Sequence, residues 1–339
     1  MKKSTFNLCV MMVLLGPVAL TSYSQEFKRT GQSTMTFLSI DPVARSVGMG
    51  GASTSMDNDV NALFHNPAGI ARIIGGAVSL NNTQWLADTK QYSIAAGYGF
   101  AGVGTFGVSM LMMDNGEIPH TIPDASRQGF HQEGTFRVTQ LALGIGYARQ
   151  ITDKFSLGGQ VKYAYQELGP TDITWQGESQ QYDTLRGVKN NRGVLAIDFG
   201  TVYFLGFKDL RVAMAFRNFA TKIRYAYEDF QLPVVLRFGM AMNVLAAIPG
   251  VQDHSLQVSV EVAHPNDYSD RVYIGGEYCF QNFFHIRGGY QLNVDEGELS
   301  AGLGITQSAL DMVFKLDYAY THYGEVFGAV HRLSVGFTF

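Results

Sequence analysis

The chain has 339 residues and a net charge of −4, and this negative balance argues against a dedicated nucleic-acid binder. Glycine is abundant at 38 residues, aromatic residues reach 12%, and charged residues make up only 16%. No stretch beyond the N-terminus approaches about 18 consecutive apolar residues, which excludes a helical membrane protein. A soluble enzyme of this length would usually carry more charge and several amphipathic helices.

The N-terminus has the pattern of an export signal. Lys2 and Lys3 provide positive charge, and residues 6–20 form an apolar run too short to count securely as a spanning helix. Small residues at alternate positions end at Ser24, so we predict that residues 1–24 are a signal peptide cleaved after Ser24. An uncleaved membrane anchor is the alternative. The mature chain would retain one cysteine, Cys279, and could form no intramolecular disulfide.

From residue 75 onwards, apolar residues alternate with small or polar ones, as in 256–263, 284–293 and 312–320. Successive side chains of a strand point to opposite faces, so each segment has one apolar and one polar face. A soluble β-sandwich shows the same alternation. The segments are, however, about 10 to 14 residues long, and their apolar faces carry Tyr and Phe towards the ends, as membrane strands do.

The pattern therefore predicts an all-β protein, a closed antiparallel transmembrane β-barrel of about 14 strands formed by residues 75–339. It would cross the outer membrane many times, in contact with its lipid. The predicted strands begin near Gly75, Thr89, Val103, Gly134, Lys154, Arg192, Leu210, Pro233, His254, Arg271, Phe283, Glu298, Asp311 and Val326.

The connections between these strands alternate in length. Those after the third, fifth and seventh strands are long, about 114–133, 170–191 and 218–232. Short turns belong in the periplasm and long loops outside the cell. Within the last long loop, 221–227 is either an extra strand or an extension above the membrane, and we favour the extension.

The final strand ends in an aromatic residue. Phe337 and Phe339 lie on one face of it, and this ending is similar to the C-terminal signal that the barrel-assembly machinery recognises. A merely hydrophobic last strand is the alternative.

Residues 25–74 precede the first strand and do not alternate. Gly50 and Gly51 permit tight turns, Asp57 or Asn58 could cap a short helix, and Pro67 would end it. A compact segment before a barrel is predicted to pack in the lumen as a hatch, or plug.

This segment also carries a family resemblance. It resembles the N-terminal signature of the PorV/PorQ family, which is related to the FadL-type transporters, through Arg45, Gly48, Gly50, Gly51, Asp59, Asn66, Pro67 and Ala68. The resemblance implies an accessory of type IX protein secretion that binds a partner translocon barrel and secreted cargo. A FadL-like transporter of hydrophobic small molecules is the alternative, and the residues do not separate the two.

Seven charged residues on the later strands are predicted to face the lumen: Arg237, Glu261, Glu277, Arg287, Lys315, Asp317 and Arg332. They could line a polar path, or they could tie the plug to the wall. We favour the second reading, because unpaired charges in a small lumen are costly.

No catalytic constellation is evident, so we do not expect an enzyme. The eight histidines lack metal-ligand spacing, and we expect no metal or cofactor. Phe130, Trp175 and Tyr182 in the long loops are candidates for contact with a protein partner or a substrate. A self-packed lid over the barrel mouth is the equal alternative.

Overall fold

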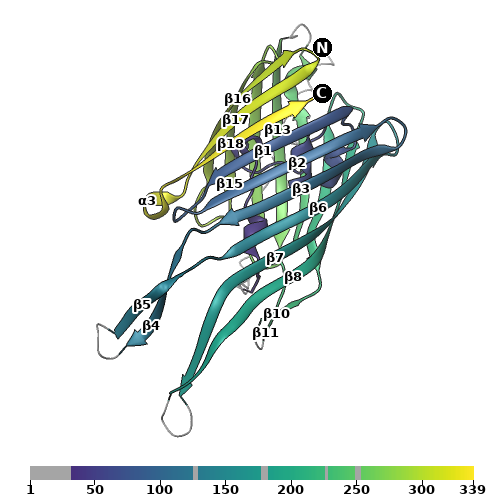
Figure 1. The fold of residues 1–339 in the computed structure, drawn as a ribbon. Helices are drawn as coiled ribbons and strands as arrows, with labels where there is room; N and C mark the ends of the chain where they lie inside the picture. The colour runs from purple at the N-terminus through teal and green to yellow at the C-terminus, as the bar shows by residue number, and fades with distance from the viewer. Residues whose placement is uncertain (1–31, 125–128, 177–181, 226–227, 249–252) are drawn as a thin grey trace, which may run out of the picture.

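The computed structural model describes residues 32–339 apart from 125–128, 177–181, 226–227 and 249–252, so the predicted signal peptide lies outside the described residues. Fourteen antiparallel strands close into one barrel (Figure 1), which confirms the predicted fold class. In chain order they are β1 (Gly75–Gln84), β2 (Lys90–Phe100), β3 (Gly104–Asp114), β6 (Thr139–Gln150), β7 (Phe155–Gln176), β8 (Tyr182–Phe204), β9 (Arg211–Ala220), β12 (Val235–Asn243), β13 (His254–Pro265), β14 (Arg271–Phe280), β15 (Phe284–Leu292), β16 (Leu299–Ala309), β17 (Met312–His322) and β18 (Ala329–Thr338). No helix in this described part is long and apolar enough to span a membrane.

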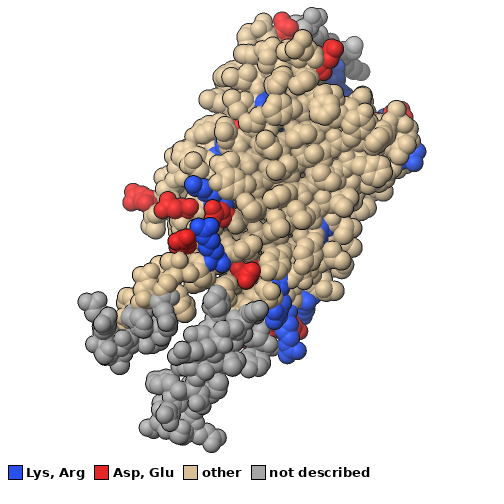
Figure 2. Space-filling model, viewed as in Figure 1, with Lys and Arg blue, Asp and Glu red and all other residues tan. Residues whose placement is uncertain are grey.

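The wall has the two faces that the alternation predicts. On β17, Leu316, Tyr318 and Tyr320 are exposed on the outside, whereas Asp317 and Ala319 are buried inside. On the side of the barrel that Figure 2 shows, the outer face of the wall is almost free of charge. An apolar outer surface flanked by aromatic residues is what the hydrocarbon core of a bilayer requires.

The barrel closes where its first strand meets its last. Strand β1 pairs antiparallel with β18 from Ala77↔Thr338 to Gln84↔His331. The pairing then extends to the terminal residue, since the Phe339 backbone exchanges hydrogen bonds of 2.9 and 2.7 Å with Gly76. The Phe339 ring covers Gly76, where a Cβ would come within 2.3 Å of it.

The two ends of the barrel differ. At one end most turns are short, and Leu310-Asp311 has positive φ at both residues, as a two-residue hairpin turn of type I′ requires. The first barrel strand begins at this end, and the last barrel strand finishes there. We assign it to the periplasm because short turns lie there in barrels of this kind.

The other end carries projections that the sequence predicts only in part. Strands β7 and β8 run on as a ribbon in which Trp175 pairs with Asp183, although 170–191 is predicted to be a loop. The register shifts between Glu167 and Pro170, so the alternation breaks while the backbone pairing continues. The ribbon therefore extends well beyond the neighbouring strands (Figure 1).

Two small hairpins lie outside the barrel sheet. Strands β4 (Ile118–Asp124) and β5 (Gly129–Phe136) form one, so the fourth barrel strand begins at Thr139 rather than near Gly134. The other is formed by β10 (Ile223–Tyr225) and β11 (Glu228–Phe230), and its first strand lies in the segment 221–227 that is predicted to be an extension of the barrel. The last strand begins at Ala329, because Val326 belongs to the short helix α3 (Gly324–Phe327).

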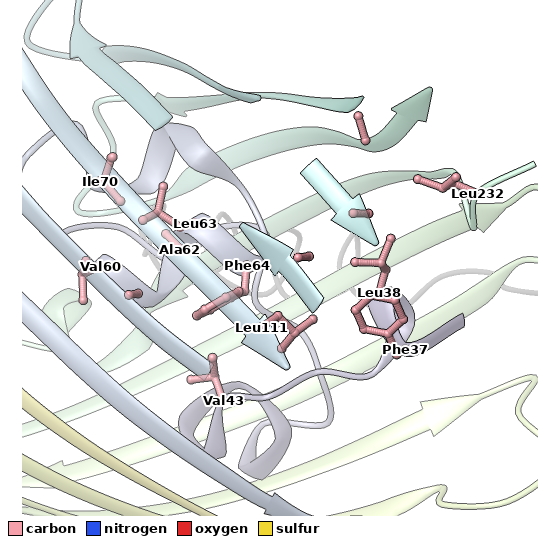
Figure 3. Packing of buried hydrophobic residues seen from close by; sticks show 14 of the residues in the cluster. Phe37, Leu38, Val43, Val60, Ala62, Leu63, Phe64, Ile70, Leu111 and Leu232 are labelled. Carbon is pink, nitrogen blue, oxygen red and sulfur yellow. The ribbon is translucent and has the colours of Figure 1, made fainter. Parts of the chain in front are cut away.

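The interior is filled by the chain that precedes β1. This lumen segment, residues 32–74, contains η1 (Thr36–Ser39), α2 (Ala44–Gly48), η2 (Val60–Phe64) and η3 (Pro67–Ile70). Its side chains Phe37, Leu63 and Ile70 are buried and form an apolar cluster with Leu111 of the wall (Figure 3). The main hydrophobic core of the protein thus lies inside the barrel.

The two faces of β17 give a first prediction. Replacing Leu316 by Arg should lower the free energy of unfolding by about 2 to 4 kcal/mol, because the new charge would lie in the bilayer. The neighbouring Lys315→Leu should lower it much less, since Lys315 faces a lumen cavity. Urea unfolding in phospholipid vesicles measures both, and equal losses would mean that the two faces are wrongly assigned.

Candidate functional site: the lumen segment and the extracellular rim

The helices of the lumen segment are short, and side chains cap two of them, η2 and η3. Asp59 accepts a hydrogen bond from the Asn61 backbone at 2.9 Å and so caps η2. Asn66 accepts one from the Ala68 backbone at 3.1 Å and caps η3, with Pro67 at its first position. Capping satisfies amide groups that would otherwise lack partners at a helix start. The Asn-Pro-Ala element is thus a helix start.

One side of the lumen segment rests directly on the backbone of β14 to β16. A Cβ at Gly48 would stand 3.2 Å from the Cα of Gly302, and one at Gly289 would stand 1.9 Å from the Gly50 nitrogen. The Gly50 amide also donates to Ser300 Oγ at 3.1 Å. Gly50 and Gly51 have φ of 67° and 83°, where other residues are strained. Glycine is needed on both surfaces here because no side chain fits between them.

The Asn66-Pro67-Ala68 element rests on β7 and β8, across the lumen. A Cβ at Gly158 would lie 2.5 Å from the Ala68 nitrogen, and one at Gly200 would lie 1.8 Å from Asn66 Oδ1. The Asn66 amide donates to the carbonyls of Thr54 at 2.8 Å and Thr201 at 3.1 Å. The lumen segment is therefore held between two glycine-lined parts of the wall.

Charged side chains form a continuous chain from the lumen segment into the wall. Arg45 forms two bonds with Glu277, Nε–Oε2 at 3.0 Å and Nη2–Oε1 at 2.8 Å, and it contacts Asp59 at 3.3 Å. Arg287 contacts Glu277 at 2.5 Å and Asp317 at 2.7 Å. Within this chain each cation lies between two carboxylates. Bidentate arginine–carboxylate pairs are strong and geometrically specific, so Arg45 fixes the position of α2 against β14.

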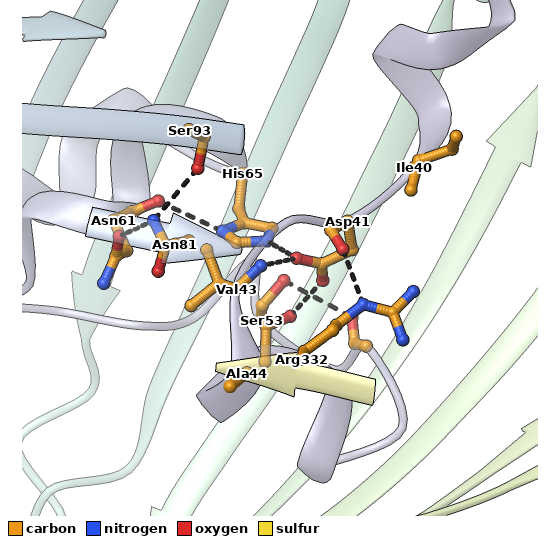
Figure 4. Close-up of polar contacts among 12 residues, drawn as sticks. Ile40, Asp41, Val43, Ala44, Ser53, Asn61, His65, Asn81, Ser93 and Arg332 are labelled. Atoms are coloured by element: carbon orange, nitrogen blue, oxygen red, sulfur yellow. Dashed lines mark hydrogen bonds and ion pairs between the residues drawn. The ribbon is translucent and has the colours of Figure 1, made fainter. Parts of the chain in front are cut away.

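Other wall charges hold the lumen segment at separate points. Glu261 accepts from the Thr54 amide at 2.8 Å and pairs with Arg237 at 2.7 Å. Arg332 donates to the Asp41 carbonyl at 3.0 Å (Figure 4). Four of the seven predicted lumen charges bond directly to the lumen segment: Arg237, Glu261, Glu277 and Arg332. Arg287 is linked to the segment through Glu277, and Asp317 is linked through Arg287.

The buried His65 and the half-buried Asp41 form a pair that the sequence analysis missed. His65 Nε2 lies 2.9 Å from Asp41 Oδ1, and the Val43 amide donates to the same oxygen at 2.9 Å (Figure 4). Burial alone would raise the pKa of Asp41, but His65 and the hydrogen bonds from Ser46 and Val43 outweigh it and lower the pKa below its usual range. The pair connects the residues between η1 and α2 to the residue that follows η2. Its members are 24 residues apart in a segment that has no periodicity, so no sequence pattern predicts their contact.

A second polar group that the sequence analysis did not identify lies on the side of the wall that contains the long strands β7 and β8. Lys162 bonds to Asp198 at 2.7 Å and to Asn218 at 2.5 Å, and Asn218 donates to the Pro233 carbonyl at 2.7 Å. The alternation of β7 and β8 places Lys162 and Asp198 inside, so the sequence could have identified them. This group links β7, β8 and β9 to one another, and it does not contact the series of ion pairs that runs from Arg45 to Asp317.

Lys315 lies in a cavity between the lumen segment and β1, β17 and β18. The cavity has a volume of about 170 Å³, and Asp59, Asn61, Ser79 and Ser334 line it as well. Among the ion pairs of the described residues, none includes Lys315. The same part of the chain contains no cluster of His, Cys, Asp and Glu that could hold a metal ion.

The candidate contact residues are on the projections. Phe130 of β5 is 55% exposed. Trp175 and Tyr182 lie on the ribbon of β7 and β8, where they pair with Asp183 and Gln176, and their side chains are outside the described residues. Phe337 packs on Phe314 with ring centroids 5.2 Å apart, beside the seam that Phe339 closes.

This architecture defines a membrane-spanning β-barrel of the outer membrane. The family described as "Type IX secretion system membrane protein PorP/SprF" matches residues 130–337, more than half of the chain, so the chain belongs to this family. The PorV/PorQ resemblance is therefore wrong, because PorP/SprF is a different family. The residues that suggested it serve helix capping, ion pairing and close packing against the wall. No curated protein matches the sequence.

Solved structures share the fold. The toluene transporter TbuX of Ralstonia pickettii is 15% identical, with 88% of this chain and 97% of that chain covered and a TM-score of 0.55. The CymD monoaromatic hydrocarbon channel is 13% identical over 88% and 97%, with a TM-score of 0.57. The toluene transporter TodX of Pseudomonas putida is 13% identical over 86% and 96%, with a TM-score of 0.57. At these identities the likeness concerns the fold alone.

The glycine contact gives a second prediction. Gly289→Ala should lower the free energy of unfolding by about 1 to 3 kcal/mol, because its Cβ would overlap the Gly50 backbone. Gly288→Ala is the matched control, since a Cβ there meets nothing within 4 Å. Urea unfolding and trypsin cleavage at Arg45 measure the effect. If Gly289→Ala behaves like Gly288→Ala, the lumen segment is not seated on β15.

The ionic chain gives a third prediction. Glu277→Ala should lower the free energy of unfolding by about 3 to 5 kcal/mol, because the buried Arg287 and the half-buried Arg45 would lose their shared carboxylate. Glu117→Ala removes a pair of similar length, 3.0 Å to Arg137, that is more than half exposed. That control should cost about 1 kcal/mol at most. If urea unfolding shows comparable losses of stability for the two variants, the ion pairs of Arg45 and Arg287 with Glu277 do not hold the lumen segment.

Proposed function

We propose that this PorP/SprF-family barrel is an accessory of type IX secretion that holds a protein partner, a translocon barrel or secreted cargo, at its extracellular rim. The observation that carries the proposal is the contrast between the two parts of the barrel. The lumen is occupied by a segment bonded to the wall on opposite sides, whereas the rim carries projecting ribbons with exposed Phe130.

The filled lumen supports a role that does not use the barrel as a pore. Glycine contacts and buried ion pairs hold the lumen segment at several independent points, so its release would break all of them together. In this proposal the segment acts as a plug that closes the barrel, and residues 25–74 belong to it. The role is one of binding, without an enzymatic step.

The rim supports partner binding by its shape. The β4–β5 hairpin and the β7–β8 ribbon both extend from the same end of the barrel (Figure 1). Beyond Glu167, the pairing described for β7 is with β8 alone. Free strand edges can add a strand from another protein, and exposed aromatic residues often anchor protein contacts.

A transporter of hydrophobic molecules is the second candidate, and one feature of the wall favours it. An apolar hollow of about 530 Å³ on the outer face of the wall, across β2, β3, β6, β7 and β8, has Ser109 and Gly144 among its lining residues. The same two residues border a small lumen cavity beside Leu38 and Phe64. A hydrophobic molecule could pass between lipid and lumen at this point if the wall opened.

The fourth prediction separates the two candidates. The tagged protein, purified from native membranes in mild detergent, should bring a large barrel or a secreted protein with it. Phe130→Ser combined with Trp175→Ser should reduce this recovery several-fold by removing aromatic anchors. Tyr268→Ser, which changes an exposed tyrosine between β13 and β14 at the same end, is the control and should leave the recovery unchanged.

Two outcomes would contradict the secretion role. One is recovery of the protein alone with bound lipid or fatty acid, which would favour transport. The other is an equal loss of partner in the Tyr268→Ser control, which would show that the β4–β5 hairpin and the β7–β8 ribbon have no special part in binding.

A further inference from the structure

A second surface on the extracellular rim lies away from the projecting ribbons. The connection between β17 and β18 carries α3, which stands out from the short side of the barrel (Figure 1). Val326 is 88% exposed and Phe327 is 56% exposed at its tip. Large apolar side chains presented together on an otherwise polar loop mark an interaction site more often than isolated ones do.

The tip is a fixed structure. The Tyr323 amide donates to the Gly328 carbonyl at 2.7 Å, and the Gly328 amide donates to the Gly324 carbonyl at 3.1 Å. Gly324 and Gly328 have φ of 69° and 70°, which lets the chain turn sharply at both ends of α3. Tyr323 packs edge-on against Trp85, with ring centroids 5.4 Å apart. The apolar pair is therefore held outward by ordered structure.

The neighbouring loop between β15 and β16, residues 293–298, places carboxylates beside the tip. A Cβ at Gly297 would lie 2.7 Å from the Tyr323 ring, and one at Gly324 would lie 2.7 Å from Glu296, so the two loops touch. Four exposed acidic residues gather here: Asp295, Glu296, Glu298 and Glu325. No ion pair among the described residues includes any of them. Figure 2 shows acidic side chains at this edge of the molecule, with Lys or Arg side chains further along the same edge.

We propose that Val326 and Phe327 dock into an apolar pocket of a protein partner whose rim carries Lys and Arg. Interfaces commonly place apolar anchors at the centre and polar groups around them. The uncompensated carboxylates would attract a basic rim and orient the partner, and they would be repelled by anionic lipid head groups. The proposal rests on the proposed function in one respect, that the barrel works with protein partners.

The experiment places a photo-crosslinking amino acid at Val326 of the full chain in living cells. The expected product is a covalent adduct with another protein, whose crosslinked peptide combines apolar residues with Lys or Arg. Glu296→Lys combined with Glu325→Lys should lower the adduct yield at least fivefold. Glu228→Lys combined with Asp229→Lys makes the same change in charge on β11 and should leave the yield unchanged.

A second probe position controls for exposure alone. Leu310 is 95% exposed on a periplasmic turn, and the crosslinker placed there should not give the same adduct. Heat-modifiable migration in gels verifies that each variant forms the barrel. An adduct with lipid only, an adduct with a second copy of this chain, or a protein adduct indifferent to the charge reversal would each overturn the proposal.

This outcome is separable from that of the proposed function. If co-purification depends on Phe130 and Trp175 but Val326 captures no protein, the docking tip is wrong and the secretion role stands. If Val326 captures a basic partner while the ribbon variants lose nothing, the ribbons are wrongly assigned and the tip proposal stands.

Discussion

Water does not reach the backbone of a strand inside the hydrocarbon core of a membrane, so every amide and carbonyl must be paired within the sheet. Pairing of the first strand with the last meets this requirement, and the terminal Phe339 completes it by bonding to Gly76. Once the sheet is closed, its alternating side chains have only two environments, lipid and lumen. The apolar outer face and the polar inner face both follow from that closure.

A closed wall of this size leaves an interior that must be filled or hydrated, and this chain fills it with its own N-terminal part. Backbone meets backbone at Gly50 and Gly289, while the intervening charges are paired: Arg45 with Glu277, and Arg237 with Glu261. Replacing a buried ion pair by apolar residues is often neutral or stabilising, so such pairs are weak evidence for stability. Their effect here is specificity, since few arrangements of the segment would satisfy all of them.

The rim lies outside the membrane and outside the lumen, so neither closure of the sheet nor filling of the interior constrains it. For that reason it carries the features that differ from a plain barrel. The ribbon of β7 and β8 continues above the membrane by backbone pairing alone, and α3 presents apolar side chains that neither the wall nor the lumen segment covers. The proposed role, binding of a partner at the surface, rests on this occupied lumen and elaborated rim. This division of roles agrees with membership of a family of secretion-system membrane proteins.

The sequence by itself determined the barrel, its fourteen strands and the direction in which Leu316 and Asp317 point. Successive side chains of a strand point to opposite faces, so neighbouring residues alone show the alternation. It also indicated which charges face inward. It could not pair Arg45 with Glu277, which are 232 residues apart, or show that Gly289 supports Gly50. It placed a loop where the ribbon lies, since pairing outside the membrane needs no apolar face. Only the tertiary structure decided these contacts, because alternation fixes the face of a side chain and closure of the barrel fixes what stands opposite it.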